Sequence, residues 1–350
     1  MFNSASRITD KKVRGLFARQ AQVVSQNLIT PQIAQMETMF SETDYFASLG
    51  SAPQLTELNK DITPLAGTVP EFSWSVKMKA YQAKLEIPKT MFTYDQIGQV
   101  GDMVNQLAQN AMNLPDKLLA SLLSGGQTST DYYYYNSSGD TSYFFGTHTI
   151  GSGGGTNLVS GNTPASYFTS SDTYNDTLAR KIWNDFNSAY TNMYAWKNTA
   201  GEPYYPTIDT KSLTIVCPAL MLPAFKFAFG AAYVAQTENM LKGTVLNIVS
   251  SPYLPVTGAT AADWYLFNTS ARVRGVLMFD YAKRSFHQDP EISGANPVPN
   301  PSTINVYTTL DSPNDGYVID TNRHLIKCER YMTLKYGEPS AVICVNNSAT

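Results

Sequence analysis

Residues 71–126 read EFSWSVKMKAYQAKLEIPKTMFTYDQIGQVGDMVNQLAQNAMNLPDKLLASLLSGG, and two periodicities follow each other in this stretch. In its first part, apolar and polar residues alternate, which is typical of strands with one solvent-exposed face. Two alternating runs separated by a short polar link predict an extended hairpin. The apolar positions of the two runs are Phe72, Trp74, Val76 and Met78, followed by Ala83, Leu85 and Ile87.

The second part of the stretch has a helical period. From Ile97 to Leu122, apolar residues recur every three or four positions, and Asp95 is a candidate N-cap. A helix that continues from there to the glycine pair at 125–126 would be roughly 40 Å long at about 1.5 Å per residue. The pattern therefore predicts an elongated spine.

Pro115 interrupts this helical pattern and leaves two interpretations open. In the first, its ring kinks one continuous helix near Ala111. In the second, Pro115 belongs to the first turn of a second helix that is capped by Asn113 or Leu114.

Outside this stretch, the sequence predicts a mixed α+β protein. Residues 125–176 are rich in Gly, Ser, Thr, Asn and Tyr, which indicates loop or irregular strand, and the glycine run at 151–155 is interpreted as flexible linker. Helical patterns cover residues 13–24, 33–40, 177–194 and 219–232, and strand patterns cover residues 213–217, 245–249, 264–267, 273–281 and 316–345.

The composition favours a folded protein that packs against other chains. The chain has 350 residues, of which 43% are hydrophobic and 12% aromatic, enough for one large core or two moderate ones. Only 15% are charged, whereas about 25% is usual in soluble domains. Interfaces are depleted in charge and enriched in aromatic residues. A monomer with a polar, uncharged surface is the alternative interpretation.

The first thirty residues are locally basic, although the formal net charge of the whole chain is -3. Such a segment is able to contact nucleic acid or an acidic partner, and a solvated helix face is the alternative. The candidate residues for such a contact are Lys11, Lys12, Arg14 and Arg19.

The sequence shows no recognisable catalytic constellation. His148, His287 and His324 lie far apart and lack the short spacing of helical zinc ligands. There is no Gly-x-Ser-x-Gly elbow and no glycine-rich phosphate loop with a following Lys-Ser or Lys-Thr. We therefore expect no catalytic residue, no cofactor site and no metal site.

Cysteine spacing and apolar runs bear on the compartment. Cys217, Cys328 and Cys344 have neither metal-ligand spacing nor the even count of a disulfide framework, so reduced thiols are expected. No secretory signal and no run of about eighteen apolar residues is visible. These observations predict synthesis in a cytoplasm and no membrane contact.

A series of short motifs resembles the major capsid protein of tailed phages with the Hong Kong 97 type fold, and within it the Mu-like prophage major head subunit family. The motifs occur in the family's order over residues 70–290. They are Leu85-Glu-Ile-Pro-Lys, Tyr94-Asp-Gln-Ile-Gly, Leu114-Pro-Asp-Lys-Leu-Leu, Phe144-Phe-Gly-Thr-His, Leu213-Thr-Ile-Val-Cys-Pro, Val249-Ser-Ser-Pro-Tyr-Leu and Asp263-Trp-Tyr-Leu-Phe.

The resemblance implies a division of the chain into domains. It comprises an N-terminal arm at 1–66, an extended hairpin loop at 67–95, a peripheral domain at 96–175 and 306–350 with a spine helix at 96–124, and an axial domain at 176–305. The hairpin would overlap a neighbouring subunit. The expected assembly-interface residues are Phe72, Trp74, Val76, Met78, Leu85 and Ile87.

The implied function is that of a non-enzymatic subunit that assembles into pentamers and hexamers of an icosahedral shell around double-stranded DNA. The implied partners are other copies of the chain, a separate scaffold, a portal and decoration proteins, with non-specific contact to packaged DNA. The protein would reside in the virion capsid after assembly in the host bacterial cytoplasm. The alternatives are a nanocompartment shell protein of the same fold, a cytoplasmic hydrolase using scattered acids with His148 or His287, and a tail or fibre component.

Overall fold

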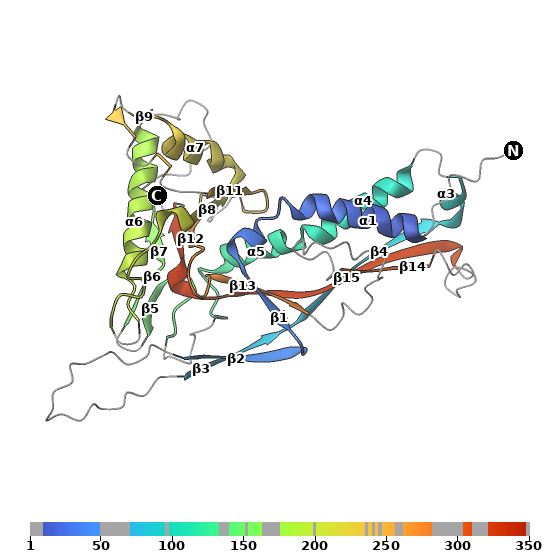
Figure 1. The fold of residues 1–350 in the computed structure, drawn as a ribbon, viewed down its shortest axis with the longest axis horizontal. Helices are drawn as coiled ribbons and strands as arrows, with labels where there is room; N and C mark the ends of the chain where they lie inside the picture. The colour runs from blue at the N-terminus through green and yellow to red at the C-terminus, as the bar shows by residue number, and fades with distance from the viewer. Residues whose placement is uncertain are drawn as a thin grey trace.

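The chain forms an elongated part and a shorter part that meet at one junction (Figure 1). The structure is a computed structural model. It describes residues 10–49, 71–94, 98–132, 140–150, 153–162, 176–198, 201–234, 237–239, 242–243, 247–255, 262–281, 304–309 and 321–347.

The elongated part is built on a five-stranded sheet whose longest strand is β15 (Arg323–Tyr336). The strands β4 (Lys79–Pro88), β13 (Val276–Tyr281) and β14 (Ile304–Thr308) all pair antiparallel with β15. The fifth strand, β1 (Gln35–Met39), adds to β13 in parallel. The alternating pattern of residues 79–88 therefore finds its partner about 240 residues later in the sequence.

Three helices lie along one face of this sheet (Figure 1): α1 (Asp10–Ser25), α4 (Gln99–Met112) and α5 (Leu114–Gly125). A short helix, α3 (Lys89–Tyr94), follows β4. The apolar stripe of α4 packs between α1 and the sheet, which removes apolar surface from water. The buried side chains of this cluster are Val13, Phe17, Ala21, Leu28, Ile87, Val100, Val104, Ala108, Met112, Ile304, Ile326 and Cys328.

The predicted spine is two helices. Helix α4 ends at Met112, Asn113 is the boundary residue, and Pro115 lies in the first turn of α5. Proline is tolerated there because that turn has no helical partner for an amide hydrogen. The second interpretation of Pro115 is confirmed, although the Asn113 side chain makes no capping hydrogen bond. The candidate cap Asp95 lies outside the described residues.

The shorter part contains a second five-stranded sheet. Helices α6 (Asp176–Ala195) and α7 (Leu222–Gly230) pack on one face of it, where Ile215, Trp264 and Ile343 are buried. The strands of this sheet, in spatial order, are β11 (Asn247–Ser251), β8 (Leu213–Pro218), β12 (Trp264–Asn268), β16 (Val342–Asn346) and β7 (Leu158–Ser160).

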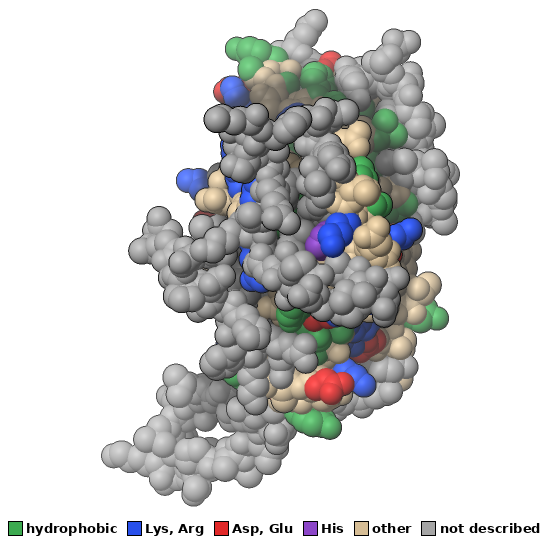
Figure 2. All heavy atoms as spheres, turned by 90° about the vertical axis from the view of Figure 1, so that its right-hand side faces the viewer, with side chains coloured by type: hydrophobic (Ala, Val, Ile, Leu, Met, Phe, Trp, Pro, Cys, Tyr) green, Lys and Arg blue, Asp and Glu red, His purple; other side chains and the backbone are tan. Residues whose placement is uncertain are grey.

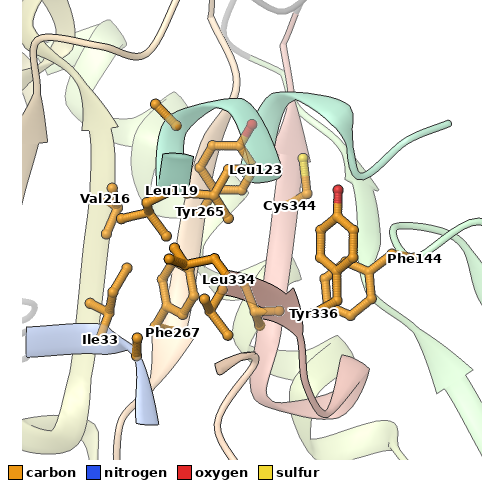
Figure 3. Close-up of a cluster of buried hydrophobic side chains, with 14 of the residues drawn as sticks. Ile33, Leu119, Leu123, Phe144, Val216, Tyr265, Phe267, Leu334, Tyr336 and Cys344 are labelled. Atoms are coloured by element: carbon orange, nitrogen blue, oxygen red, sulfur yellow. The ribbon is translucent and has the colours of Figure 1, made fainter. Parts of the chain in front are cut away.

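The opposite face of the second sheet packs on the elongated part. Figure 3 shows this junction, where aromatic and aliphatic side chains from β8 and β12 meet those of α5 and β15. Phe144 stacks on Tyr336 with ring centroids 4.2 Å apart. One continuous core therefore joins the two sheets. The labelled side chains are Ile33, Leu119, Leu123, Phe144, Val216, Tyr265, Phe267, Leu334, Tyr336 and Cys344.

Several strands join sheets that their position in the sequence did not predict. β13 comes from the range expected for the axial domain, yet it belongs to the long sheet, while β16 and β7 come from the peripheral ranges and belong to the second sheet. In β16, Val342 through Val345 are all buried. Such a strand needs cover on both faces, which a central place in the second sheet provides.

The helix expected at residues 33–40 is wrong. Helix α2 (Thr30–Ile33) has a single turn, and β1 follows it directly. The apolar residues Met36 and Met39 fit a helical spacing in isolation, but pairing with β13 holds the backbone extended. Tertiary pairing has overridden the local pattern.

The glycine run at 151–155, interpreted as linker, is partly a strand. β6 (Gly153–Thr156) pairs antiparallel with β5 (Thr147–Ile150). A Cβ atom on Gly153 would lie 1.8 Å from the backbone oxygen of Asn198, so only glycine fits this close approach. Short elements complete the fold: β9 (Tyr233–Val234), β10 (Thr237–Glu238), and the 3-10 turns η4 (Thr210–Ser212), η5 (Ala219–Met221) and η8 (Pro339–Ala341).

Candidate assembly surface

A two-stranded ribbon, formed by β2 (Thr43–Leu49) and β3 (Glu71–Lys77), is a sheet of its own, and neither strand pairs with a strand of the two large sheets (Figure 1). The expected hairpin between the two alternating runs is therefore wrong. The first run, β3, pairs with β2, whereas the second run, β4, pairs with β15. The chain changes partner at Met78, whose amide donates to the Glu42 carbonyl at 2.9 Å.

The inner face of the ribbon packs on the chain's own long sheet. Val76 is 0% and Met78 is 8% exposed, and both belong to a cluster with Leu277 and Phe279 of β13. Trp74 packs against the same cluster, with its ring centroid 6.1 Å from that of Phe279. Val76 and Met78 therefore cannot provide the exposed interface that their alternation predicted, because the subunit itself covers them.

Two of the remaining expected interface residues, Leu85 and Ile87, also pack within the subunit. Ile87 is 1% exposed within the cluster under α1 and α4, and Leu85 packs against that cluster. Both residues stabilise the elongated part from its helical face, so Ile87 is corrected from interface to core. The Phe72 side chain lies outside the described part of the chain.

The outer face of the ribbon is the exposed one. Tyr45 is opposite Ser75 in the register and is 82% exposed. Phe40, in the turn before β2, is 62% exposed, and Met36 on β1 is 47% exposed. Burying a large apolar side chain releases on the order of 1.5–3 kcal/mol, so these side chains are the candidates for a contact with another surface. Sequence reasoning missed Tyr45 because β2 and its register with β3 were not recognised, and it missed Met36 and Phe40 because residues 33–40 were predicted to be a helix.

The basic residues near the N-terminus lie on α1. Lys12 and Arg19 are exposed, Arg14 is half-buried, and the Lys11 side chain lies outside the described residues. Val13 and Phe17 anchor the opposite face of the helix in the core. On the face shown in Figure 2, basic side chains of the described residues are scattered among polar and hydrophobic ones.

The side chains of Asp140, His148 and Tyr132 form a buried hydrogen-bonded group. His148 Nδ1 lies 2.6 Å from Asp140 Oδ2, and the Tyr132 hydroxyl donates to the same carboxylate oxygen at 2.9 Å. Burial alone would raise the pKa of Asp140, but hydrogen bonds from His148, the Ser142 amide and Tyr132 lower it overall. His148 and Asp140 are 2% and 3% exposed, so no substrate reaches them.

The other candidates from the sequence also lie in packed surroundings. His324 is buried on β15, and His287 lies outside the described residues. Cys217, Cys328 and Cys344 are free thiols, all buried. Burial raises the pKa of the Cys217 thiol to about 12, which makes it unreactive as a nucleophile.

The described ranges show a cleft and no arrangement suited to a metal ion or to a membrane-spanning helix. In these ranges, no group of three or more His, Cys, Asp or Glu side chains is arranged to hold a metal. None of the helices described combines the length and apolar character that a membrane crossing requires. A cleft of about 300 Å³ lies between α5 and the ends of β4 and β15, lined by Lys79, Tyr81, Leu118, Ser121, Leu122, Gly125, Ser129, Asp131, Thr333, Leu334, Lys335 and Tyr336.

Comparison with solved structures shows the same fold in phage capsids. The capsid chain of cyanophage P-SCSP1u matches with a TM-score of 0.53 at 12% identity, covering 91% of this chain and 87% of the other. The mature capsid of bacteriophage PhiM1 matches with a TM-score of 0.51 at 8% identity, again covering 91% and 87%. The bacteriophage JBD30 capsid matches with a TM-score of 0.47 at 9% identity; 91% of this chain aligns and spans 64% of that one.

Comparison of sequences identifies the family. No curated protein sequence matches significantly. A family model described as phage capsid protein matches residues 74–324, which is most of the chain and covers β4, the helices of the spine and every strand of the second sheet except β16. The expected resemblance to a non-enzymatic tailed-phage capsid subunit with the Hong Kong 97 type fold is thereby confirmed. The chain belongs to the phage capsid protein family, as a structural subunit of the virion shell.

Proposed function

We propose that this subunit assembles into pentamers and hexamers of a closed icosahedral shell around double-stranded DNA, and that the outer face of the β2–β3 ribbon contacts a neighbouring subunit. The family match to residues 74–324 supports the shell. The single observation that carries the contact is the exposure of Tyr45, at 82%, on a ribbon whose other face is buried.

The inner face gives the ribbon a fixed position on the subunit. A two-stranded ribbon is only marginally stable in isolation, but Val76 and Met78 attach this one to Leu277 and Phe279. The outer face is thus presented by a rigid support, and its contacts would form with little further ordering. Many copies of a modest contact are sufficient in a shell, because repeated contacts act together.

The shorter part of the subunit, which contains the second sheet, would supply contacts around the symmetry axes of the shell. Leu220 in η5 is 40% exposed and Tyr233 in β9 is 69% exposed, and both lie beside α7. We assign the sheet containing β8, β12 and β16, with its covering helices, to the axial domain. The long sheet with α4 and α5 would form the peripheral domain, α1 would belong to the arm that lies along it, and the β2–β3 ribbon would form the loop that reaches a neighbour.

The basic face of α1 would meet acidic partners inside the shell. Lys12 and Arg19 are exposed there, and phosphate contacts by such side chains are non-specific and weaken with salt. Packaged DNA and an acidic segment of a separate scaffold are the two partners of this chemistry. Portal and decoration proteins complete the expected partners, and assembly in the host bacterial cytoplasm remains a prediction.

Negative-stain electron microscopy of the full chain, expressed in bacterial cells, tests this function. We expect closed shells or ring-shaped capsomers. A chain that stays monomeric at high concentration, alone and with its scaffold, would refute the shell. Nucleic acid that survives nuclease treatment inside particles is expected for a virion and contradicts an enzyme-filled nanocompartment.

The contact itself is tested with Tyr45→Ser. This change removes an exposed ring, so the subunit should fold normally and give fewer particles. Tyr143→Ser is the matched control, since Tyr143 is also an exposed tyrosine, at 52%, but lies outside the ribbon. Equal particle yields from Tyr45→Ser and the wild type would show that the outer ribbon face is not an assembly contact.

A further inference from the structure

Residues 28–35, here called the crossing segment, run across the junction between the two sheets. Ile33 is 0% exposed and belongs to the core cluster that contains Val216 and Phe267 of the second sheet and Leu334 of the long sheet. Figure 3 shows Ile33 beside Phe267, at the edge of this cluster. The crossing segment therefore touches both halves of the subunit.

One carboxylate holds the start of the crossing segment. Asp116, in the first turn of α5, is 6% exposed. Its Oδ1 accepts the Thr30 amide at 2.9 Å and the Thr30 hydroxyl at 2.7 Å, and its Oδ2 accepts the Ile29 amide at 3.1 Å. Helix α2 has no side-chain cap of its own at Ile29, so Asp116 supplies that cap from the spine.

Two groups from other elements hold the end of the crossing segment. Arg274, in the connection from β12 to β13, donates from Nη1 to the Ala34 carbonyl at 2.9 Å, and its amide donates to Gln35 Oε1 at 3.2 Å. Asn247, at the start of β11, donates from Nδ2 to Gln32 Oε1 at 3.0 Å. Groups of the spine, of the second sheet and of the connection between the sheets thus all form hydrogen bonds with the same eight residues.

We propose that the crossing segment sets the angle between the two sheets, and that Asp116 is the positioning residue that fixes it. The inference rests on the proposed function, because a shell needs its subunits to hold a defined curvature. Hydrogen bonds to a charged acceptor are strong, and buried donors left without a partner are costly. Releasing the start of the crossing segment would free Ile33 to shift and the two sheets to rotate about their shared core.

Asp116→Ala removes the cap, and Thr30→Val removes only the hydroxyl donor while keeping the shape of the side chain. Asp102→Ala is the matched control, because Asp102 is an exposed carboxylate in the first turn of α4. Hydrogen exchange with mass spectrometry measures opening of residues 28–35 in the unassembled subunit. Electron microscopy measures the distribution of particle diameters.

We expect exchange of residues 28–35 to rise on the order of tenfold in Asp116→Ala and less in Thr30→Val, with β8 unchanged. The distribution of particle diameters should broaden most in Asp116→Ala and less in Thr30→Val, while Asp102→Ala matches the wild type. If Asp116→Ala does not fold, Thr30→Val still supplies the comparison. Wild-type shells of one size with unchanged diameters in every folded variant would overturn this inference alone. A wild type that forms no shells would refute the proposed function, and the inference with it.

Discussion

The burial of Val76 and the exposure of Tyr45 predict that two substitutions on one ribbon separate folding from assembly. Val76→Ala removes two fully buried carbon atoms, which is worth about 1.6 kcal/mol at about 0.8 kcal/mol for each buried methylene. The cavity left against Leu277 and Phe279 raises the expected loss of unfolding free energy to about 2 kcal/mol. Tyr45→Ala, at a side chain that is 82% exposed, should change it by less than about 0.5 kcal/mol.

Urea unfolding of the unassembled subunit, followed by tryptophan fluorescence, measures both values, and particle yield is measured in parallel. Val76→Ala should shift the unfolding midpoint to lower urea with the same slope, and its remaining folded subunits should still assemble. Tyr45→Ala should keep the midpoint and lose assembly. The reverse result, with Val76→Ala stable but unable to assemble, would show that Val76 contacts a neighbouring subunit and that the assigned inner face is incorrect.

Three further predictions concern groups away from the ribbon. Burial would raise the pKa of Asp140, but the hydrogen bond from His148 and the weaker ones lower the folded-state pKa overall from 3.8. The ionised carboxylate therefore stabilises the fold above the unfolded-state pKa of 3.8, and this contribution is lost as the pH falls through the folded-state pKa. Asp140→Asn should flatten the dependence of urea stability on pH below about pH 4, and an unchanged acid slope would contradict the assignment. With its pKa raised to about 12 by burial, the Cys217 thiol should resist iodoacetamide at about pH 8 until urea unfolds the chain, and rapid labelling of the native protein, seen by mass spectrometry, would argue against burial. A Cβ on Gly337 would meet the Arg274 carbonyl oxygen at 2.0 Å, whereas one on Gly15 meets nothing within 4 Å; calorimetry should show Gly337→Ala destabilised by about 1–3 kcal/mol and Gly15→Ala stabilised by about 1 kcal/mol, and equal melting temperatures would contradict both.

The elements with strong local patterns could be predicted from the sequence. Helices α4 and α5 and strand β4 each have ten residues or more, so one period dominates locally in each of them. Pro115 offered two interpretations, since proline is compatible with a kink and with a first turn. Only the path of the backbone at Asn113 decides between them.

Partners distant in the sequence could not be predicted. Alternation identifies which residues of β3 share a face, but not that β2 pairs with it or that Leu277 and Phe279 cover that face. Val76 therefore looked like an interface residue when it is a core residue. A strand's pattern specifies a buried face without specifying what buries it.

The roles of Asp116 and Tyr45 could not be predicted from the sequence for the same reason, because both depend on partners distant in the chain. Asp116 looks in the sequence like an ordinary acid in the first turn of a helix, where carboxylates are favourable. Its actual donors at Ile29 and Thr30 lie 87 and 86 residues earlier in the chain. Tyr45 carried no signal either, because exposure on a ribbon depends on the register between β2 and β3.

A three-dimensional reconstruction of the assembled particle by cryo-electron microscopy, at a resolution that shows side chains, reveals which face of the ribbon meets a neighbouring subunit. We expect a closed shell in which Tyr45 contacts an adjacent subunit while Val76 stays packed on Leu277 and Phe279 of its own subunit. A shell in which Tyr45 faces solvent, or in which the ribbon leaves its own sheet so that Val76 packs on a neighbour, would contradict it.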